Sequence, residues 1–190
     1  IGEYAQMING EKWLKNGVTC VLSVISCLNY THQHPYSLRI KPSPNLPNDQ
    51  SINLYPSLCF FEGTNVSVGR GTEKQFQIYG SPFLKGFDFQ FIPQPNVGAK
   101  DPVHNGKICF GEDLSKITPV KQLELKWLIK AYHQTENKTQ FFNNFFVKLA
   151  GNQTLQKQIE SGLSETEIRQ SWQQGLEDFK LIRNKYLLYE

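Results

Sequence analysis

The sequence lacks a strong excess of charge of either sign. Its 190 residues hold 20 Lys and Arg against 17 Asp and Glu, which gives a formal net charge of +3. Proteins that bind nucleic acid or an anionic membrane surface usually carry a clustered basic excess. The composition therefore argues against a nucleic-acid partner and against membrane-surface binding.

Long apolar runs are also missing. A helix that crosses a bilayer needs about 20 consecutive apolar residues. The longest apolar stretch here is VTCVLSVISCL, residues 18–28. It is too short and too rich in β-branched residues for such a helix, and it predicts a β-strand. We expect no membrane span.

Cysteines are few and widely spaced. Cys20, Cys27, Cys59 and Cys109 form no CxxC pair and have no histidine at ligand spacing, so we expect no metal site. Each lies in an apolar, strand-like segment. We therefore predict buried free thiols, with disulfides as the alternative.

The hydrophobic pattern changes near Thr118. Before it the apolar segments are short and strand-like, at residues 18–27, 57–61, 87–93 and 106–111. After it the spacing is helical, and the Thr118-Pro119 pair is typical of a helix start. A second helical face begins at Phe141 and is stopped by Gly151.

The best helix signal lies near the end of the chain. Ser164 and Glu167 have capping-box spacing, and an apolar stripe from Ile168 to Tyr186 follows. We predict an α+β fold, with a mixed β-sheet in the first two thirds and packed helices at the C-terminus. Residues 1–190 are expected to form a single domain.

Residues 40–57 contain Pro42, Pro44, Pro47 and Pro56, which remove backbone donors and disfavour helix. This pattern predicts a long extended segment. Such a loop is either functional or a stiff connection between two strands, and the sequence leaves both open.

The most unusual stretch is FFEGTNVSVGRGT, residues 60–72. We predict a strand over residues 58–61 with Glu62 at its end, then a glycine-rich loop, then a helix that begins after Thr72. Backbone N–H groups at a helix start bind anions, and Arg70 between two glycines can grip a carboxylate or phosphate. The loop lacks the GK[ST] ending of a P-loop. The alternative is that Arg70 pairs with a nearby carboxylate and the glycines only turn the chain.

No Ser-His-Asp or Cys-His signature is present. Glu62, Glu3 and Glu11 are the carboxylates of interest, because glycoside cleavage needs two carboxyl groups about 5 to 9 Å apart. The sequence does not show which of them meet.

Four segments together resemble the bacterial exo-β-N-acetylmuramidase family, long described as a domain of unknown function. They are GEYAQMINGEKWL, PSPNLPN, SLCFFEGTNVSVGRGT and the tail GLSETEIRQSWQQGLEDFKLIRNKYLLY. The resemblance runs over nearly the whole chain. It implies an enzyme that removes N-acetylmuramic acid from the non-reducing end of peptidoglycan fragments, with no cofactor.

The resemblance also implies an architecture. Family members have a Rossmann-like N-terminal half and a smaller α/β half, with the active site between them. Residues 1–190 correspond to the smaller C-terminal half. The N-terminal half, where the family's proposed catalytic glutamate lies, is absent and is the expected partner. A peptidoglycan substrate implies a periplasmic or secreted protein.

On this resemblance, Arg70 is expected to read the lactyl carboxylate of muramic acid. Glu62 is expected to bind sugar and is also a candidate acid or base, while the catalytic residues are otherwise unassigned. The expected substrate-binding residues are Glu62, Gly63, Thr64, Asn65, Ser67, Gly69, Arg70, Gly71, Thr72 and Asn45. Two other function classes stay open: a non-catalytic carbohydrate- or anion-binding module, and a structural domain in which the loop is only a turn.

Overall fold

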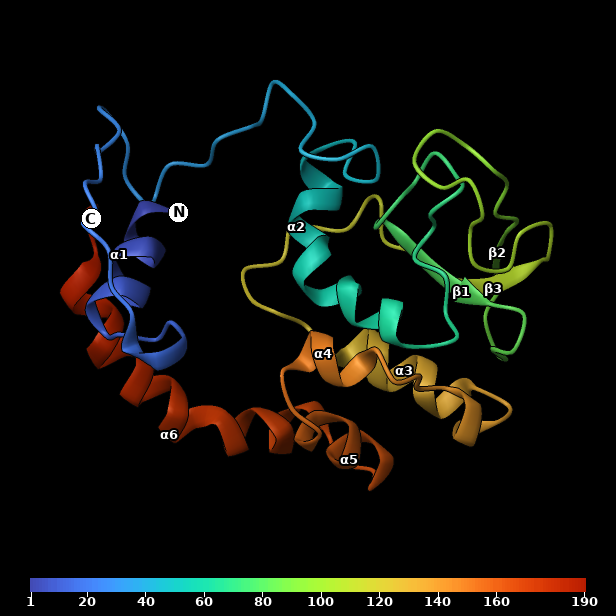
Figure 1. Cartoon of the computed structure of the whole chain (residues 1–190). Coiled ribbons are helices and arrows are strands. Elements are labelled where there is room, and N and C mark those ends of the chain that lie inside the picture. Colours follow the sequence, from blue (N-terminus) through green and yellow to red (C-terminus); the bar gives the residue numbers. More distant parts are fainter. The chain divides into compact units, whose positions relative to one another are not determined.

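The computed structural model describes all 190 residues, which form two compact units (Figure 1). Unit 1 consists of Ile1–Tyr36 and Arg169–Glu190, and unit 2 consists of Ser37–Ile168. None of the helices is both long enough and apolar enough to cross a membrane.

Unit 1 joins the two ends of the chain. Helix α1 (Gly2–Gly10) lies beside the C-terminal part of helix α6 (Glu165–Arg183) (Figure 1). The Glu11 carboxylate accepts hydrogen bonds from Tyr186 Oη at 2.8 Å and from Lys185 Nζ at 3.2 Å. One carboxylate thus ties the end of α1 to the turn that follows α6.

The capping box predicted for α6 is confirmed. Ser164 N donates to Glu167 Oε2 at 2.8 Å, and Glu167 N donates to Ser164 Oγ at 3.3 Å. These bonds satisfy backbone donors that the first helical turn leaves free.

The strand predicted at residues 18–28 is wrong. The segment is extended but pairs with no other strand, and Val21 and Ile25 are 102% and 94% exposed. Its backbone is held by side chains instead, because Asn9 bonds both backbone groups of Cys20 and the Tyr189 hydroxyl accepts from Cys27 N. Apolar composition alone does not make a strand when no neighbouring edge is available.

Unit 2 contains a three-stranded antiparallel sheet in the order β1-β3-β2. Its strands are β1 (Ile78–Ser81), β2 (Phe89–Phe91) and β3 (Cys109–Asp113). The predicted strands at 87–93 and 106–111 are confirmed, whereas β1 was not foreseen. Together with six helices the sheet confirms the α+β class.

Helix α2 (Asp49–Leu58) occupies part of the predicted proline-rich loop, so that prediction is wrong for its second half. Asn48 caps the helix by accepting from Ser51 N at 2.9 Å. Leu54 and Leu58 are fully buried on one face, and this burial outweighs the proline near the helix end. The predicted strand at 58–61 is also wrong, because a 3₁₀ helix, Cys59–Gly63, follows α2 directly.

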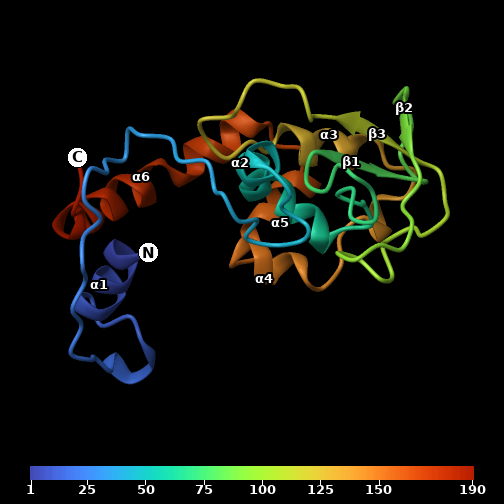
Figure 2. The ribbon, with the colours of Figure 1, turned by 90° about the horizontal axis from the view of Figure 1, so that it is seen from above.

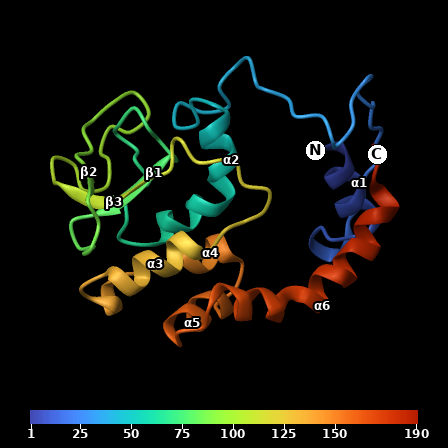
Figure 3. The same cartoon turned by 180° about the vertical axis from the view of Figure 1, so that it is seen from behind.

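The remaining helices of unit 2 are α3 (Lys126–Gln134), α4 (Phe146–Ala150) and α5 (Thr154–Glu160). Figures 1 and 3 show these three helices on one side of α2 and the sheet, and Figure 2 shows α3 alongside β1 and β3. Gly151 ends α4 in a left-handed conformation with φ 76°, as predicted.

The prediction that a helix starts at Thr118 is wrong, because α3 begins only at Lys126. The Asn53 side chain explains the difference. It accepts from Val120 N at 2.8 Å and donates to Val120 O at 2.9 Å. These two hydrogen bonds hold the segment before α3 in a non-helical conformation.

The core of unit 2 lies between α2, the sheet and the C-terminal helices. Phe61 stacks on Tyr79 with ring centroids 4.8 Å apart, and both side chains are fully buried. Phe141 and Phe146 extend the same core toward α4. Phe61 therefore anchors the start of the glycine-rich loop.

All four cysteines are free, as predicted, but only Cys109 is fully buried. Cys59 is half-buried. Cys20 and Cys27 are exposed, so their predicted burial is wrong. Both belong to the segment that finds no partner strand.

Candidate functional site

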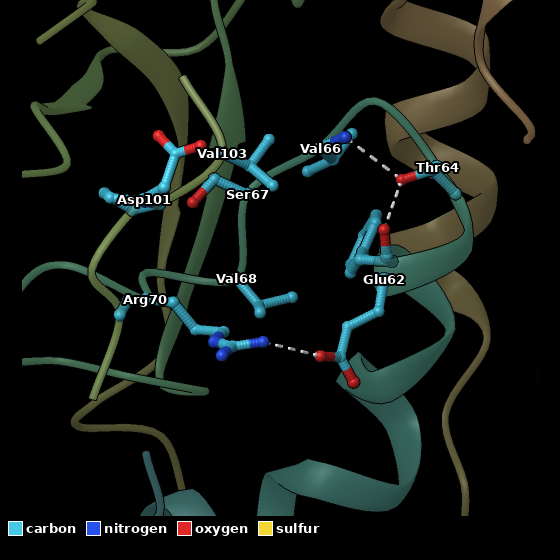
Figure 4. A pocket seen from close by; sticks show the side chains of 11 residues that line it. Glu62, Thr64, Val66, Ser67, Val68, Arg70, Asp101 and Val103 are labelled. Atoms are coloured by element: carbon cyan, nitrogen blue, oxygen red, sulfur yellow. Dashed lines mark hydrogen bonds and ion pairs between the residues drawn. The ribbon is translucent and has the colours of Figure 1, made fainter. Parts of the chain in front are cut away.

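Unit 2 contains a cavity of about 180 Å³ beside Arg70, which we call the Arg70 cavity. Its first wall comes from residues 61–70 and its second wall from residues 99–103 (Figure 4). The lining residues are Phe61, Glu62, Thr64, Val66, Ser67, Val68, Arg70, Ala99, Asp101, Pro102 and Val103.

The first wall is fixed to the sheet by its backbone. Ser67 N donates to Gly80 O at 2.8 Å, and Gly80 N donates to Ser67 O at 2.9 Å. Thr64 turns the chain away from the 3₁₀ helix, since its hydroxyl donates to Phe61 O and accepts from Val66 N. The wall is therefore rigid without being a regular strand.

The helix predicted after Thr72 is absent. Thr72 Oγ1 donates to Gly69 O at 2.7 Å and accepts from Lys74 N at 3.0 Å, which makes a turn. Phe76 then takes a left-handed φ of 52°, and a helix cannot continue through that conformation. The predicted helix start beside Arg70 is therefore absent, and of the two predicted anion-binding features only the arginine side chain is present.

Arg70 has a local partner. Its Nη1 lies 3.3 Å from Glu62 Oε1 and its Nη2 lies 3.4 Å from Gly98 O, and both bonds are long (Figure 4). Its Nε is buried without a hydrogen-bond partner. Since a guanidinium carries five N–H donors, Arg70 keeps donors for a ligand.

The second wall was missed by the sequence analysis. Asp101 is exposed and lies on the other side of the cavity from Glu62 (Figure 4). It comes from a turn-rich stretch, residues 96–106, in which no motif marks it. The dense Asn, Gly, Pro and His content of that stretch is a signal of a structured loop, but not of a place beside Arg70.

Of the ten predicted binding residues, four line the cavity: Glu62, Thr64, Ser67 and Arg70. The glycines shape it instead. A Cβ at Gly63 would lie 2.5 Å from Phe146 Cα, and a Cβ at Gly71 would lie 2.6 Å from Gln94 O.

Asn45 and Asn65 also stand outside the lining. Asn45 Nδ2 donates to Gly98 O at 2.7 Å, the same carbonyl oxygen that Arg70 contacts. Asn65 O accepts from His104, and Asn65 Oδ1 is buried without a partner. Both residues therefore bond to the segments that form the cavity walls.

Two side chains near the cavity, Cys59 and Tyr55, have raised pKa values. Burial, and next the Glu62 carboxylate, raise the pKa of the Cys59 thiol to about 11. The same two causes raise the pKa of Tyr55. Both side chains therefore stay neutral at physiological pH.

Glu3 and Glu11 do not line this cavity. Glu3 accepts from Leu188 N at 2.7 Å and contacts His32 Nε2 at 3.0 Å, all within unit 1. Both glutamates tie the N-terminal helix to the C-terminal tail. No group of three or more His, Cys, Asp or Glu side chains lies close enough together to hold a metal ion.

The sequence matches two models of one protein family. Residues 53–189 match the family model described as exo-β-N-acetylmuramidase NamZ, C-terminal, and residues 1–50 match the corresponding N-terminal model. Peptidoglycan β-N-acetylmuramidase NamZ of Bacillus subtilis is 30% identical over 209 residues, which cover all of this chain and 50% of that protein.

Two solved structures are similar over the whole chain. A DUF1343 family protein from Bacteroides fragilis superposes with a TM-score of 0.95 at 47% identity, and 55% of it is covered. A second one from the same organism has a TM-score of 0.76 at 18% identity, with 56% covered, and shows the fold alone. The chain spans about half the length of the relatives it matches.

Proposed function

The chain belongs to the exo-β-N-acetylmuramidase NamZ family, and on this premise we propose that it is part of a glycoside hydrolase that releases N-acetylmuramic acid from the non-reducing end of peptidoglycan fragments. The family resemblance seen in the sequence is confirmed. The proposed activity belongs to a protein about twice as long as this chain, as its relatives are. The chain contributes one wall of the substrate cleft.

The observation that carries the proposal is the Arg70 cavity inside the family-matched region. All of its lining residues fall within residues 53–189. Pockets that enclose a small ligand usually measure about 300 to 1,000 Å³. A cavity of about 180 Å³ holds part of a saccharide, which fits one side of a larger cleft.

Arg70 is the proposed receptor for the lactyl carboxylate, the group that distinguishes muramic acid from glucosamine. Arginine binds carboxylates through two parallel hydrogen bonds, and Arg70, which lines the cavity, uses one donor on Glu62 and one on Gly98. Glu62 and Asp101 then accept from sugar hydroxyls. The ion pair with Arg70 orients Glu62 for binding, so we assign it to the sugar and not to acid–base chemistry.

The rest of the N-terminal half is the proposed partner of unit 1. Residues 1–50 match the N-terminal family model, and the exposed apolar segment 18–28 lies among them. Exposed apolar side chains in one segment are typical of a surface that another domain covers. Because peptidoglycan lies outside the cytoplasmic membrane, we propose a periplasmic or secreted location.

A non-catalytic binding module is the second candidate. It is favoured by the Glu62–Arg70 ion pair, which engages the one carboxylate of the loop that was a candidate acid or base. In that case the Arg70 cavity would bind muramic acid without cleaving it.

The test is release of nitrophenol from a nitrophenyl β-N-acetylmuraminide, with the matching glucosaminide as control. We would assay this chain alone and an extended protein that adds the N-terminal half of the 47% identical Bacteroides fragilis relative. The relative from Bacillus subtilis, peptidoglycan β-N-acetylmuramidase NamZ, is the positive control. Cleavage of the muraminide only, and only by the extended protein, supports the proposal. An inactive extended protein beside an active relative would favour the binding module.

Arg70 itself is tested in the extended protein. Arg70→Ala should lower kcat/KM for the muraminide about 10- to 100-fold, because a charge-assisted bond contributes about 1.5 to 3 kcal/mol. Arg70→Lys keeps the positive charge but loses the planar pair of N–H donors, and we expect its kcat/KM to lie between those of the parent and Arg70→Ala. An Arg70→Ala protein with unchanged kinetics and lowered stability would assign the arginine to the fold alone.

A further inference from the structure

His104 stands in an unusual backbone conformation at the edge of the Arg70 cavity. Asn105 N donates to Pro102 O at 3.0 Å, so residues 102–105 form a turn with His104 in its third place. Its φ is 62°, in the left-handed region where turns normally use glycine or asparagine. Among non-glycine residues, asparagine, aspartate and histidine are enriched in this region, so the side chain decides which of the three stands here.

The imidazole ring provides the reason. His104 Nε2 lies 2.7 Å from Asn65 O and 3.3 Å from Ser81 Oγ, and the ring meets Phe83 edge-on at 5.7 Å. A carbonyl oxygen can only accept, so Nε2 carries the hydrogen and donates it. The ring is half-buried, its bonded nitrogen points at a backbone carbonyl, and His104 is not among the residues that line the cavity.

This bond joins the two walls of the cavity. Asn65 lies between Thr64 and Val66 of the first wall, and His104 directly follows Val103 of the second wall. At the other end the segments next to the walls are joined. Gln94 N donates to Gly71 O at 2.8 Å, and Arg70 contacts Gly98, which precedes the second wall. His104 is thus the tie between residues 64–66 of the first wall and the Val103 end of the second wall.

We propose that His104 is a positioning residue, which sets the width of the Arg70 cavity and so the placement of Asp101 and Val103 against the ligand. The inference rests on the proposed function, since it concerns binding of the same saccharide. His104 contacts no reacting atom. Burial lowers the pKa of the imidazole and so favours the neutral ring, although the bond to Asn65 O acts in the opposite direction.

The test compares three variants of the extended protein. His104→Asn suits the left-handed backbone but is too short to reach Asn65 O. His104→Gly relaxes the backbone and also lacks the donor. His104→Gln places an amide nitrogen the same number of bonds from Cβ as Nε2 and restores the donor.

We expect KM for the muraminide to rise about tenfold in His104→Asn and His104→Gly, with kcat changed by less than about twofold, because the loss is in binding. His104→Gln should return KM to within about threefold of the parent. Equal KM values in all four proteins would overturn the proposal. So would a rise in His104→Gln as large as in His104→Asn, because the donor would then not be the cause.

A second readout does not depend on catalysis. In ¹H–¹⁵N spectra of the extended protein, the imidazole of His104 should show the Nε2–H tautomer, and His104→Asn should shift the amide signals of residues 64–67. An Nδ1–H tautomer, or unmoved signals, would overturn the positioning role even in an active enzyme. If the parent protein has no muramidase activity but the spectra behave as expected, the proposed function fails and the role of His104 in fixing the walls stands.

Discussion

Two stretches of this chain show that an apolar composition does not by itself bring burial. Residues 61–70 lie against the sheet, and Val66 and Val68 are 2% and 3% exposed. Residues 18–28 are far more apolar, with eight apolar residues of eleven against three of ten, yet most of their large side chains are open to solvent. The first stretch has Gly80 as a backbone partner, whereas the second has only the side chains of Asn9 and Tyr189. Burial therefore depends on a matching edge as much as on composition.

Thiol labelling should separate the two stretches most clearly. Cys20 and Cys27 of the exposed segment should react quickly with a thiol reagent in the native protein. Burial raises the pKa of Cys59 to about 11 and of Cys109 to about 12, from an ordinary 9.0. Their thiolate fractions, and hence their rates, should be about 100-fold and 1,000-fold lower. Mass spectrometry of timed samples gives the rates, and fast labelling of Cys109 before unfolding would contradict the burial described.

Truncation in the buried stretch should cost much more than truncation in the exposed one. Phe61→Ala removes a fully buried ring stacked on Tyr79, and we expect a loss of about 3 to 5 kcal/mol in the free energy of unfolding. Val21→Ala, the matched control, should change it by less than about 0.5 kcal/mol. Urea unfolding followed by circular dichroism measures both. Comparable losses in the two variants would mean that residue 21 is packed in solution.

Glycines near the first wall allow a finer test of crowding. Gly71 and Gly106 share a left-handed φ, of 84° and 71°, but only Gly71 has neighbours that an added Cβ would meet. Gly71→Ala should therefore destabilise by about 2 to 4 kcal/mol, and Gly106→Ala by about 1 to 2 kcal/mol from the backbone alone. The difference between the thermal midpoints of the two variants measures the part of the destabilisation that comes from steric clash at Gly71. Equal shifts would show that the second wall moves away from Gly71 freely.

The smallest effect concerns Asp113, which pairs with Lys74 just after the first wall. Burial acts to raise the pKa of Asp113, but hydrogen bonds from Lys74 and Ser115 outweigh it and hold the pKa below its ordinary 3.8. A lowered carboxyl pKa stabilises the fold above the ordinary value and loses this contribution as pH falls through the folded value. Since Lys74 is partly exposed, we expect about 0.5 kcal/mol.

Lys74→Met checks this. Its deficit in the free energy of unfolding should be present at pH 6 and shrink below about pH 4, as Asp113 becomes protonated. Asp113→Asn should show the same loss, and the double variant should lose no more than either single one. A deficit that does not change with pH would assign the loss to packing of the lysine chain.

Local signals predicted part of this fold. The capping box of α6, the end of α4 at Gly151 and strands β2 and β3 depend on residues close in sequence. Helix α2 and the start of α3 could not be predicted in this way. Asn53 bonds Val120, 67 residues away, and the burial of Leu54 overrides the prolines. Contacts between residues far apart in the sequence therefore determine where α2 forms and where α3 begins.

The residues of the candidate site also divide into those that local sequence predicts and those that depend on the fold. Glu62, Thr64, Ser67 and Arg70 were predicted because one unusual loop carries them all. Asp101 was missed because only the folded chain brings residues 99–103 opposite that loop. A single sequence carries no mark of that approach.

The carbonyl oxygen of Gly98 receives both Asn45 Nδ2 and Arg70 Nη2. Two donors that share one acceptor are not independent, so the effect of a change at position 45 depends on which residue stands at position 70. Among homologues this predicts epistasis between the two positions. The proline-rich segment and the glycine-rich loop would then evolve as one unit, although 25 residues separate Asn45 from Arg70 along the chain.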